Sequence, residues 1–193
     1  MIMSDDPGAF LTGRLLVAMP GIGDPRFERA VIFVCAHTAE HAMGIVVNRP
    51  VEGLSLARVL AGIGVKSSIK LPDDLVLLGG PVERDRGLVL HSDDYFCAAS
   101  SVRVAPGFTL TATREALEAL AGHNSRPRRS LLALGYAGWG AGQLEHEIRE
   151  STWLTCEPDE SLIFGDDYER KWSRALAKIG VAADKLSGLA GRA

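Results

Sequence analysis

The chain has 193 residues, of which 47% are hydrophobic and 23% charged, with a formal net charge of -3 and a pI near 6.0. A chain of this size can bury the core of one globular domain, so we expect a single domain over residues 1–193. The acidic balance excludes a global positive field that would collect nucleic acid phosphates or an anionic membrane, so we expect neither direct nucleic acid binding nor membrane association.

The cysteines and the first residues of the chain indicate the cellular compartment in which the protein is expected. Cys35, Cys97 and Cys156 are odd in number, far apart and in apolar surroundings, which favours a reduced protein of the cytoplasm. Residues 1–13 contain acidic residues where a secretory peptide needs a basic residue and an apolar run, and no later run has the length of a membrane span. We expect residues 1–9 to form a flexible arm.

The first half of the chain is rich in strand patterns. Apolar runs between turn residues predict strands at 11–19, 30–36, 42–47, 75–78, 87–91 and 96–104. Pro50 lacks a backbone N–H, so it is expected to end the third strand, and the first three strands should form an antiparallel meander. A short helix at 55–61 is expected to stop at a left-handed Gly62, and Gly79-Gly80-Pro81 to form a bend.

Helix patterns become more frequent in the second half. The expected elements are a helix at 114–121 capped by Thr113, strands at 130–134 and 152–156, a helix carrying Leu144 and Ile148, and a weak turn at 185–189. Asp166 and Glu169 resemble a capping box that opens a helix towards Gly180. Strands followed by helices, without regular alternation, predict the α+β class.

The segment LGYAGWGAGQLEHE, residues 134–147, places four glycines around one tryptophan. We interpret it as a packing device between a strand and a helix, in which glycine lets another backbone pass close by. The alternative is an anion site formed by the amides that precede the helix at Gln143. Neither GxGxxG nor GxxxxGK[ST] is present, so the nucleotide-binding fingerprints do not support that alternative.

Several long motifs carry a family resemblance. LTGRLLVAMPGIGDPRFERAVIFVCAH, AMGIVVNRP, GGPVERDRGLVLHS and LGYAGWGAGQLEHEI follow one another in this order, and Trp153 comes soon after. Together they resemble the YqgE/AlgH family, also called UPF0301 or DUF179. The resemblance implies an α+β fold with a bifurcated, mostly antiparallel sheet curled into a pseudo-barrel and flanked by helices. It implies no catalytic residues, although some members carry the label of transcriptional regulator.

A polar pocket is predicted where strand-end loops meet the glycine segment. Asp24 and Asn48 are expected to stabilise turns, whereas the planar guanidinium of Arg49 suits a carboxylate or a phosphate. The residues predicted to contact a ligand are Arg26, Asn48, Arg49, Gly80, Trp139, Gly140 and Gln143. The expected partner is a small ligand or another protein, whose identity the sequence leaves open.

Other residues fit known chemistry less well. His37 and His41 are expected in a solvated loop, and His91 in a turn formed with the Ser92-Asp93-Asp94 run. No GxSxG motif accompanies the three apolar cysteine sites, so we expect no catalytic residue, metal or cofactor. The one basic concentration, Arg126, Arg128 and Arg129, is expected to be a solvated loop.

Three hypotheses about function follow. The leading one is a non-enzymatic cytoplasmic protein with a binding or regulatory role. The second is a transcriptional regulator that contacts DNA through the arginine loop, which the acidic net charge and the missing helix-turn-helix disfavour. The third is a hydrolase of unknown substrate in which His91 serves as general base beside the neighbouring acids.

Overall fold

A computed structural model describes residues 10–122 and 124–187. The strands are β1 (Leu15–Ala18), β2 (Val31–His37), β3 (His41–Val46), β4 (Pro50–Ser55), β5 (Leu75–Leu78), β6 (Val82–His91), β7 (Ser101–Ala105), β8 (Phe108–Thr111), β9 (Ser130–Gly140) and β10 (Trp153–Cys156). The helices are α1 (Leu56–Gly62), α2 (Arg114–Leu120), α3 (Gln143–Arg149), α4 (Glu160–Phe164), α5 (Lys171–Lys178) and α6 (Ala183–Ser187), with 3-10 turns η1 (Pro25–Phe27) and η2 (Tyr168–Arg170). The arm expected at 1–9 lies outside the described residues, as do the last two residues of the turn expected at 185–189.

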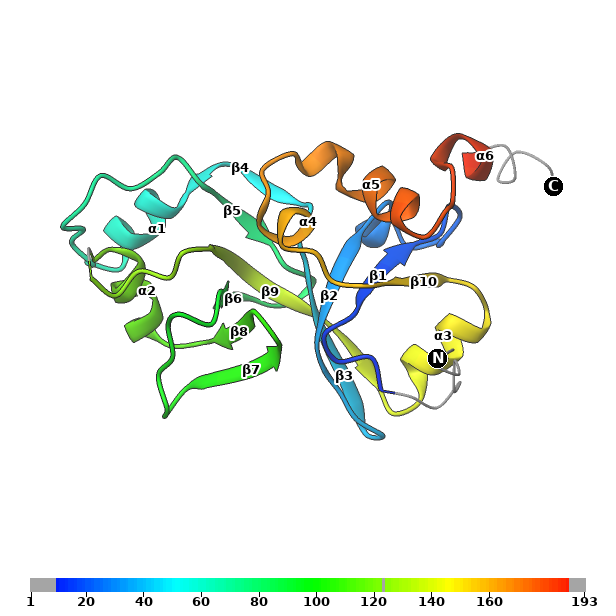
Figure 1. The fold of residues 1–193 in the computed structure, drawn as a ribbon, viewed down its shortest axis with the longest axis horizontal. Helices are drawn as coiled ribbons and strands as arrows, with labels where there is room; N and C mark the ends of the chain where they lie inside the picture. Colours follow the sequence, from blue (N-terminus) through cyan, green and yellow to red (C-terminus); the bar gives the residue numbers. More distant parts are fainter. Residues whose placement is uncertain (1–9, 123, 188–193) are drawn as a thin grey trace.

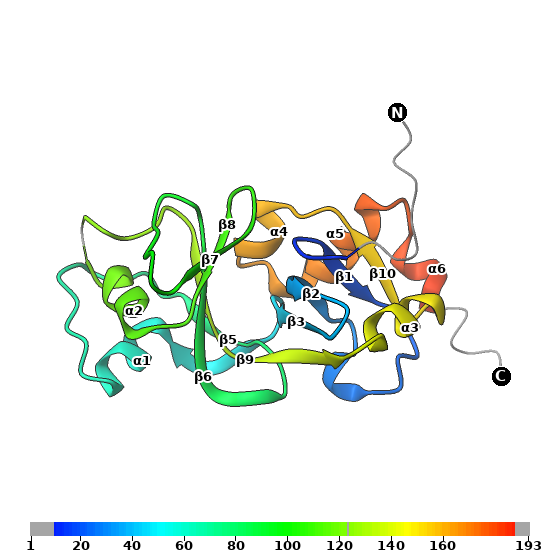
Figure 2. The ribbon, with the colours of Figure 1, turned by 90° about the horizontal axis from the view of Figure 1, so that it is seen from below.

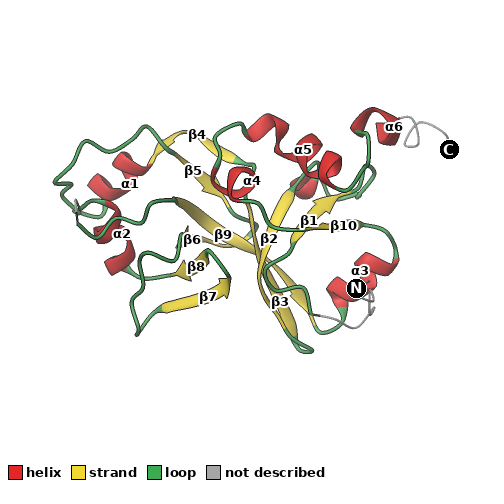
Figure 3. Ribbon diagram, viewed as in Figure 1, coloured by secondary structure: helices red, strands yellow, loops and turns green. Residues whose placement is uncertain are grey.

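The strands form a mostly antiparallel sheet that curls into a half-barrel with helices on its flanks (Figures 1 and 3). The sheet divides at β9. One edge of β9 pairs with β6, while the other pairs in parallel with β5 at residues 133–134 and antiparallel with β3 at residues 137–140. The order β10-β1-β2-β3-β9-β6-β8-β7, with β5 and β4 branching off, confirms the α+β fold and the bifurcated sheet. Among the described residues, no helix is long and apolar enough to span a membrane.

The glycine segment explains why β9 can serve two branches. The strand expected at 130–134 continues to Gly140, because glycines allow the backbone before β6 to pass close to it. A Cβ atom on Gly80 would lie 2.0 Å from the carbonyl carbon of Tyr136, and one on Gly79 would lie 2.3 Å from the carbonyl oxygen of Gly135. Gly135 itself has a φ of 74°, which favours glycine. At the point where the sheet divides, the fork, the backbone of Gly79 and Gly80 thus packs directly against the backbone of β9.

Three apolar clusters fill the space around the sheet. Neighbouring residues of β1 and β2 point to opposite faces and both faces are covered, which explains their unbroken apolar sequences. One face packs against α4 and α5, the other against α3, and α1 and α2 cover the far branch (Figure 2). The cluster beneath α4 and α5 contains Phe33 and Trp172, and the cluster beneath α3 contains Ile32 and Leu144. The cluster beneath α1 and α2 contains Leu60 and Leu120.

Several expected boundaries in the first half are wrong. The third strand ends at Val46, before Asn48-Arg49-Pro50 as expected, but Pro50 itself opens β4, where it stands opposite Leu77. The strand expected at 96–104 begins only at Ser101, because the amide and the hydroxyl of Ser101 close a turn with Cys97. The left-handed residue after α1 is Gly64, with a φ of 74°, and not Gly62.

The second half contains two elements that the sequence did not indicate, β8 and α4. Asp159 caps α4, accepting hydrogen bonds from the backbone amides of Ser161 and Leu162. The expected capping box at Asp166 and Glu169 is wrong. The chain there forms the 3-10 turn η2, and α5 begins directly after it.

Candidate functional site

A cleft of about 420 Å³ lies between the loop that contains η1, the bend before β6, the end of β9 and helix α3. Of the predicted residues, Arg26, Trp139 and Gln143 line it. Pro81, which directly follows Gly80, also lines the cleft. The other lining residues are Ile22, Asp24, Phe27, Val82, Gly138, Glu147, Thr152 and Trp153. The strand-end loop and the glycine segment therefore meet in one cleft.

Glu147 organises the wall formed by α3, β9 and β10. Its Oε2 atom accepts hydrogen bonds from the indole nitrogens of Trp139 at 2.9 Å and Trp153 at 2.7 Å. Its Oε1 atom accepts one from Nε2 of Gln143, also at 2.9 Å. The two indole rings meet edge to face with centroids 6.1 Å apart, so one carboxylate fixes two large rings at once.

Gln143 also closes the turn between β9 and α3. Its Oε1 atom accepts the N–H of Gly140 at 3.0 Å, and Gly142 enters the helix with a φ of 68°. The Gly140 amide in the alternative anion site is therefore already satisfied within the chain. Gly140 contributes to the cleft indirectly, by holding the Gln143 side chain in place.

Asp24 and Arg26 line the cleft from the η1 loop. Asp24 caps η1 and binds the guanidinium in bidentate geometry, at 3.0 Å to Nε and 2.7 Å to Nη2. These hydrogen bonds from Arg26 lower the pKa of Asp24. Phe27, from the same turn, packs edge to face on Trp153 with ring centroids 5.8 Å apart. This contact joins the η1 loop to the indole wall, the part of the cleft formed by Trp139, Trp153, Gln143 and Glu147.

Asn48 and Arg49 lie behind the loop and do not line the cleft. Asn48 donates to the carbonyl of Arg29 at 2.8 Å and accepts from the amide of Val31 at 2.9 Å, the turn-stabilising role expected of it. Arg49 donates through Nη2 to the carbonyl of Glu28 at 2.8 Å. Both side chains therefore hold the loop that carries Arg26, and ligand contact by them stays a prediction.

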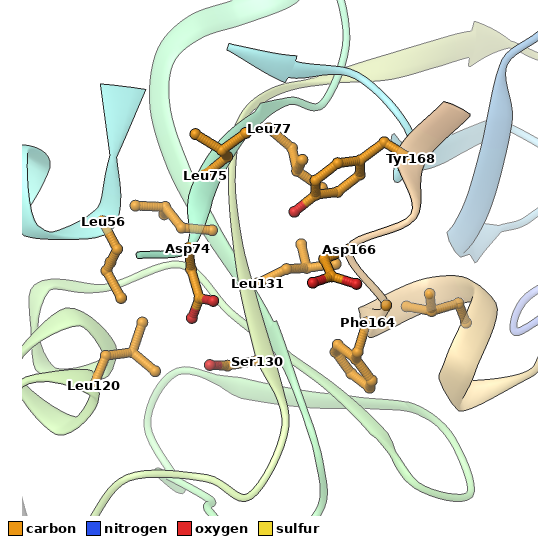
Figure 4. Close-up of a pocket in the computed structure, with 13 residues that line it drawn as sticks. Leu56, Asp74, Leu75, Leu77, Leu120, Ser130, Leu131, Phe164, Asp166 and Tyr168 are labelled. Carbon is orange, nitrogen blue, oxygen red and sulfur yellow. The ribbon is translucent and has the colours of Figure 1, made fainter. Parts of the chain in front are cut away.

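A second cavity, of about 40 Å³, lies between β5, β9 and the segment after α4. Figure 4 shows Asp74, Asp166 and Tyr168 around it, with apolar residues between them. The two carboxylates contribute to a raised pKa of Tyr168, whose main cause is burial. The volume suits water and is too small for a typical small-molecule ligand.

His91 is wholly buried, with both ring nitrogens engaged. Nδ1 lies 2.9 Å from the carbonyl oxygen of Ser92, so it carries the proton, and Nε2 accepts from the Thr111 hydroxyl at 2.8 Å. Burial lowers the pKa of His91 and favours this neutral form. The expected turn is present, as Asp94 accepts from Ser92 and from the amide of Arg128. A closed, satisfied imidazole does not suit a general base.

The expectation for His37 is wrong. Its side chain is buried in β2, where Nδ1 accepts the N–H of Leu11 at 2.9 Å and Nε2 lies 3.0 Å from Oε1 of Glu145. The sequence suggested a solvated link because α3, which supplies Glu145, comes more than a hundred residues later. His41, at the start of β3, is exposed as expected.

The arginine loop has partners inside the chain. Arg126 donates to the carbonyl of Leu120 at 3.1 Å, and Arg128 pairs with Glu160 at 2.9 Å. The pairing of Arg128 reduces the positive charge that this loop could offer to phosphates. Among the described residues, no group of three or more His, Cys, Asp or Glu side chains could hold a metal ion.

Glu147 and Trp153 were missed as site residues. The only signal in the sequence is the spacing of Gln143 and Glu147, which places two polar side chains four residues apart on one helix face. Their meeting with the indole of Trp139 depends on the turn at Gly142 and on the return of the chain through β10. Pattern alone could not supply that contact.

Comparisons with known proteins agree with the sequence motifs. The family model described as AlgH-like matches residues 15–184. A UPF0301 protein from Caulobacter vibrioides (strain NA1000 / CB15N) is 61% identical over 192 residues, covering 100% of this chain and 98% of that protein. Another UPF0301 protein, from Bradyrhizobium sp., is 50% identical and covers 96% of this chain and 89% of its own length.

Solved structures show the same fold. The solution structure of the AlgH protein from Pseudomonas aeruginosa, UPF0301, has a TM-score of 0.75 and 36% identity, with 100% of both chains covered. A crystal structure of a protein from Corynebacterium diphtheriae has a TM-score of 0.68 over 91% of this chain and 88% of that one, and at 19% identity it supports the fold alone. The chain therefore belongs to the AlgH-like family, UPF0301.

Proposed function

We propose that this protein is a non-enzymatic binding protein of the cytoplasm, with a regulatory role, and that a small ligand occupies the cleft between η1 and α3. The observation that carries the proposal is the cleft itself. Its volume of about 420 Å³ falls within the roughly 300–1,000 Å³ typical of small-molecule sites. Its lining combines aromatic and aliphatic walls with a few polar groups, as such sites do.

The state of the polar groups favours binding over catalysis. Asp24 is paired with Arg26, and Glu147 accepts three hydrogen bonds, so neither carboxylate is poised to abstract a proton from a substrate. Burial raises the pKa of Cys35 to about 12 and also raises that of Cys156, which disfavours thiolate nucleophiles. A ligand that is bound and not converted can act only by changing how the protein contacts other molecules. Such an effect suits a regulatory role.

Gly138 allows the cleft to be filled without disturbing the core. It lies on the exposed side of β9, and an added Cβ would rest 3.6 Å from the ring of Tyr136 and 3.8 Å from Val82, both ordinary contacts. Because Gly138 and Val82 both line the cleft, the methyl groups of Gly138→Val are expected to narrow it. Gly62→Val is the matched control, because nothing lies within 4 Å of a Cβ added there and Gly62 is remote from the cleft.

The test is a fragment screen by ligand-observed NMR, followed by titrations of the wild type and both variants. We expect fragments that bind the wild type and Gly62→Val, with affinity lost at least about tenfold in Gly138→Val, a difference of about 1.4 kcal/mol. Fragments that bind all three proteins equally would place the site elsewhere. A screen without binders at millimolar concentration would remove the cleft as a small-ligand site.

A further inference from the structure

We infer that the ligand of this cleft carries a protonated amine on an apolar body, with the ammonium group seated beside Glu147. This inference rests on the proposed function and adds the chemical class of the ligand. Two independent properties of the cleft support it, namely its inventory of hydrogen-bonding groups and its balance of charge.

The two indole N–H groups of this wall already have an acceptor. Both indole N–H groups end on Oε2 of Glu147, and one N–H of Gln143 ends on Oε1. A carboxylate has about four lone-pair sites, so one acceptor position remains on Oε1. This wall therefore presents an acceptor at its centre, and a ligand group that donates a hydrogen bond completes it.

The charges that line the cleft favour a cation. Asp24 and Glu147 contribute two negative charges and Arg26 one positive charge, which leaves a net charge of -1. Asp24 holds the guanidinium of Arg26 in a bidentate pair at η1, whereas the donors that Glu147 binds within the described part of the chain are all neutral. The uncompensated charge thus lies at the indole wall, where an ammonium group finds both a carboxylate and aromatic rings.

The remaining lining explains the apolar body. The apolar residues Ile22, Phe27, Pro81 and Val82 also line the cleft. A chain of several methylene groups extending from the ammonium would displace water from these surfaces, and each buried methylene contributes about 0.8 kcal/mol. A bare inorganic cation would leave these apolar walls wet. An alkylamine is therefore the simplest probe of the site.

The experiment compares three probes of similar shape: pentan-1-amine, the neutral pentan-1-ol and the anionic hexanoate. Binding is followed through the indole N–H signals in two-dimensional NMR spectra. Signals of Trp139 and Trp153 should move on addition of the amine, while that of Trp172, which donates to the carbonyl of Ala18 in the core, should stay in place. We expect the amine to bind at least about tenfold more tightly than the alcohol, and hexanoate to bind most weakly.

Glu147→Gln tests the carboxylate directly, because it removes the charge and preserves shape. The affinity for the amine should fall about tenfold, towards that of the alcohol, whose own affinity should change little. Glu150→Gln, the same change at an exposed position just after α3, should alter neither affinity. If Glu147→Gln does not fold by circular dichroism, salt titration of the wild type decides, since added salt should weaken binding of the amine and not of the alcohol.

The possible results separate the inference from the proposed function. Equal affinities for amine and alcohol, or an unchanged affinity in Glu147→Gln, would overturn the inference while leaving the cleft a binding site. The same holds if a screened fragment binds in the cleft and pentan-1-amine does not. Failure of every fragment and every probe would overturn both proposals.

Discussion

Replacing Glu147 by leucine should destabilise the protein strongly. The substitution removes the carboxylate that accepts hydrogen bonds from the indole N–H groups of Trp139 and Trp153. Both tryptophans are buried, with only 6% and 2% of their surface exposed. An unsatisfied buried donor costs about 1–3 kcal/mol, and water in the cleft can satisfy part of this demand, so we expect a loss of about 2–4 kcal/mol in the free energy of unfolding. Glu147→Gln keeps an oxygen facing both indoles and should cost about 1 kcal/mol.

Urea denaturation followed by far-ultraviolet circular dichroism measures this loss without relying on the fluorescence of the affected tryptophans. Glu150→Leu is the control. It makes the same change in charge and size at an exposed position that does not contact the indoles of Trp139 and Trp153. A loss below about 1 kcal/mol for Glu147→Leu, or equal losses for the leucine and glutamine variants, would refute the role of Glu147 as the shared acceptor.

Three further predictions concern pH and packing. Burial lowers the pKa of His91 from 6.5, so the unfolded chain binds a proton that the folded chain excludes, and the free energy of unfolding should fall as the pH drops below about 6.5. Urea midpoints on either side of that pH should differ less in His91→Gln than in the wild type. Burial lowers the pKa of Lys171 from 10.5 to about 7, so stability should rise with pH across that window, by about 2 kcal/mol from neutral pH to pH ~9. Lys171→Met should lack this rise in the same assay, and an equal rise in both proteins would contradict the assignment. Gly80→Ala, with its Cβ 2.0 Å from the backbone of Tyr136, should lose more than about 3 kcal/mol, whereas Gly62→Ala should stay within about 1 kcal/mol in thermal denaturation.

The parts of the fold that follow from local chemistry could be predicted from sequence. The strand expected at 75–78 matches β5, and α2 begins after Thr113 as expected, because apolar periodicity and residues typical of helix starts act within a few residues. Even there, the hydroxyl of Thr113 donates to Ser100 instead of capping the helix. Local pattern placed the element, and tertiary contact decided what the side chain binds.

Features that depend on distant partners could not be predicted. The glycines after Leu134 suggested the end of a strand, yet β9 continues because another backbone segment packs against Gly135 and Tyr136. His37 was expected to be solvated, but α3 places Glu145 against its buried ring. The same limit applies to the cleft, since Trp139 and Gln143 were predicted to line it, whereas the role of Glu147, the last residue of the glycine segment, was not predicted.

The fork at β9 also constrains the order in which the protein can fold. The hairpin of β2 and β3 joins residues close in sequence, but β3 pairs next with residues 137–140, and β5 and β6 both require residues 130–136. During synthesis, β3, β5 and β6 must therefore each keep one edge unpaired until β9 leaves the ribosome. Closing such long loops is entropically costly and slows folding, and an unpaired edge strand can recruit other chains. Until β9 joins the two branches, a newly made chain therefore exposes strand edges at which it can aggregate.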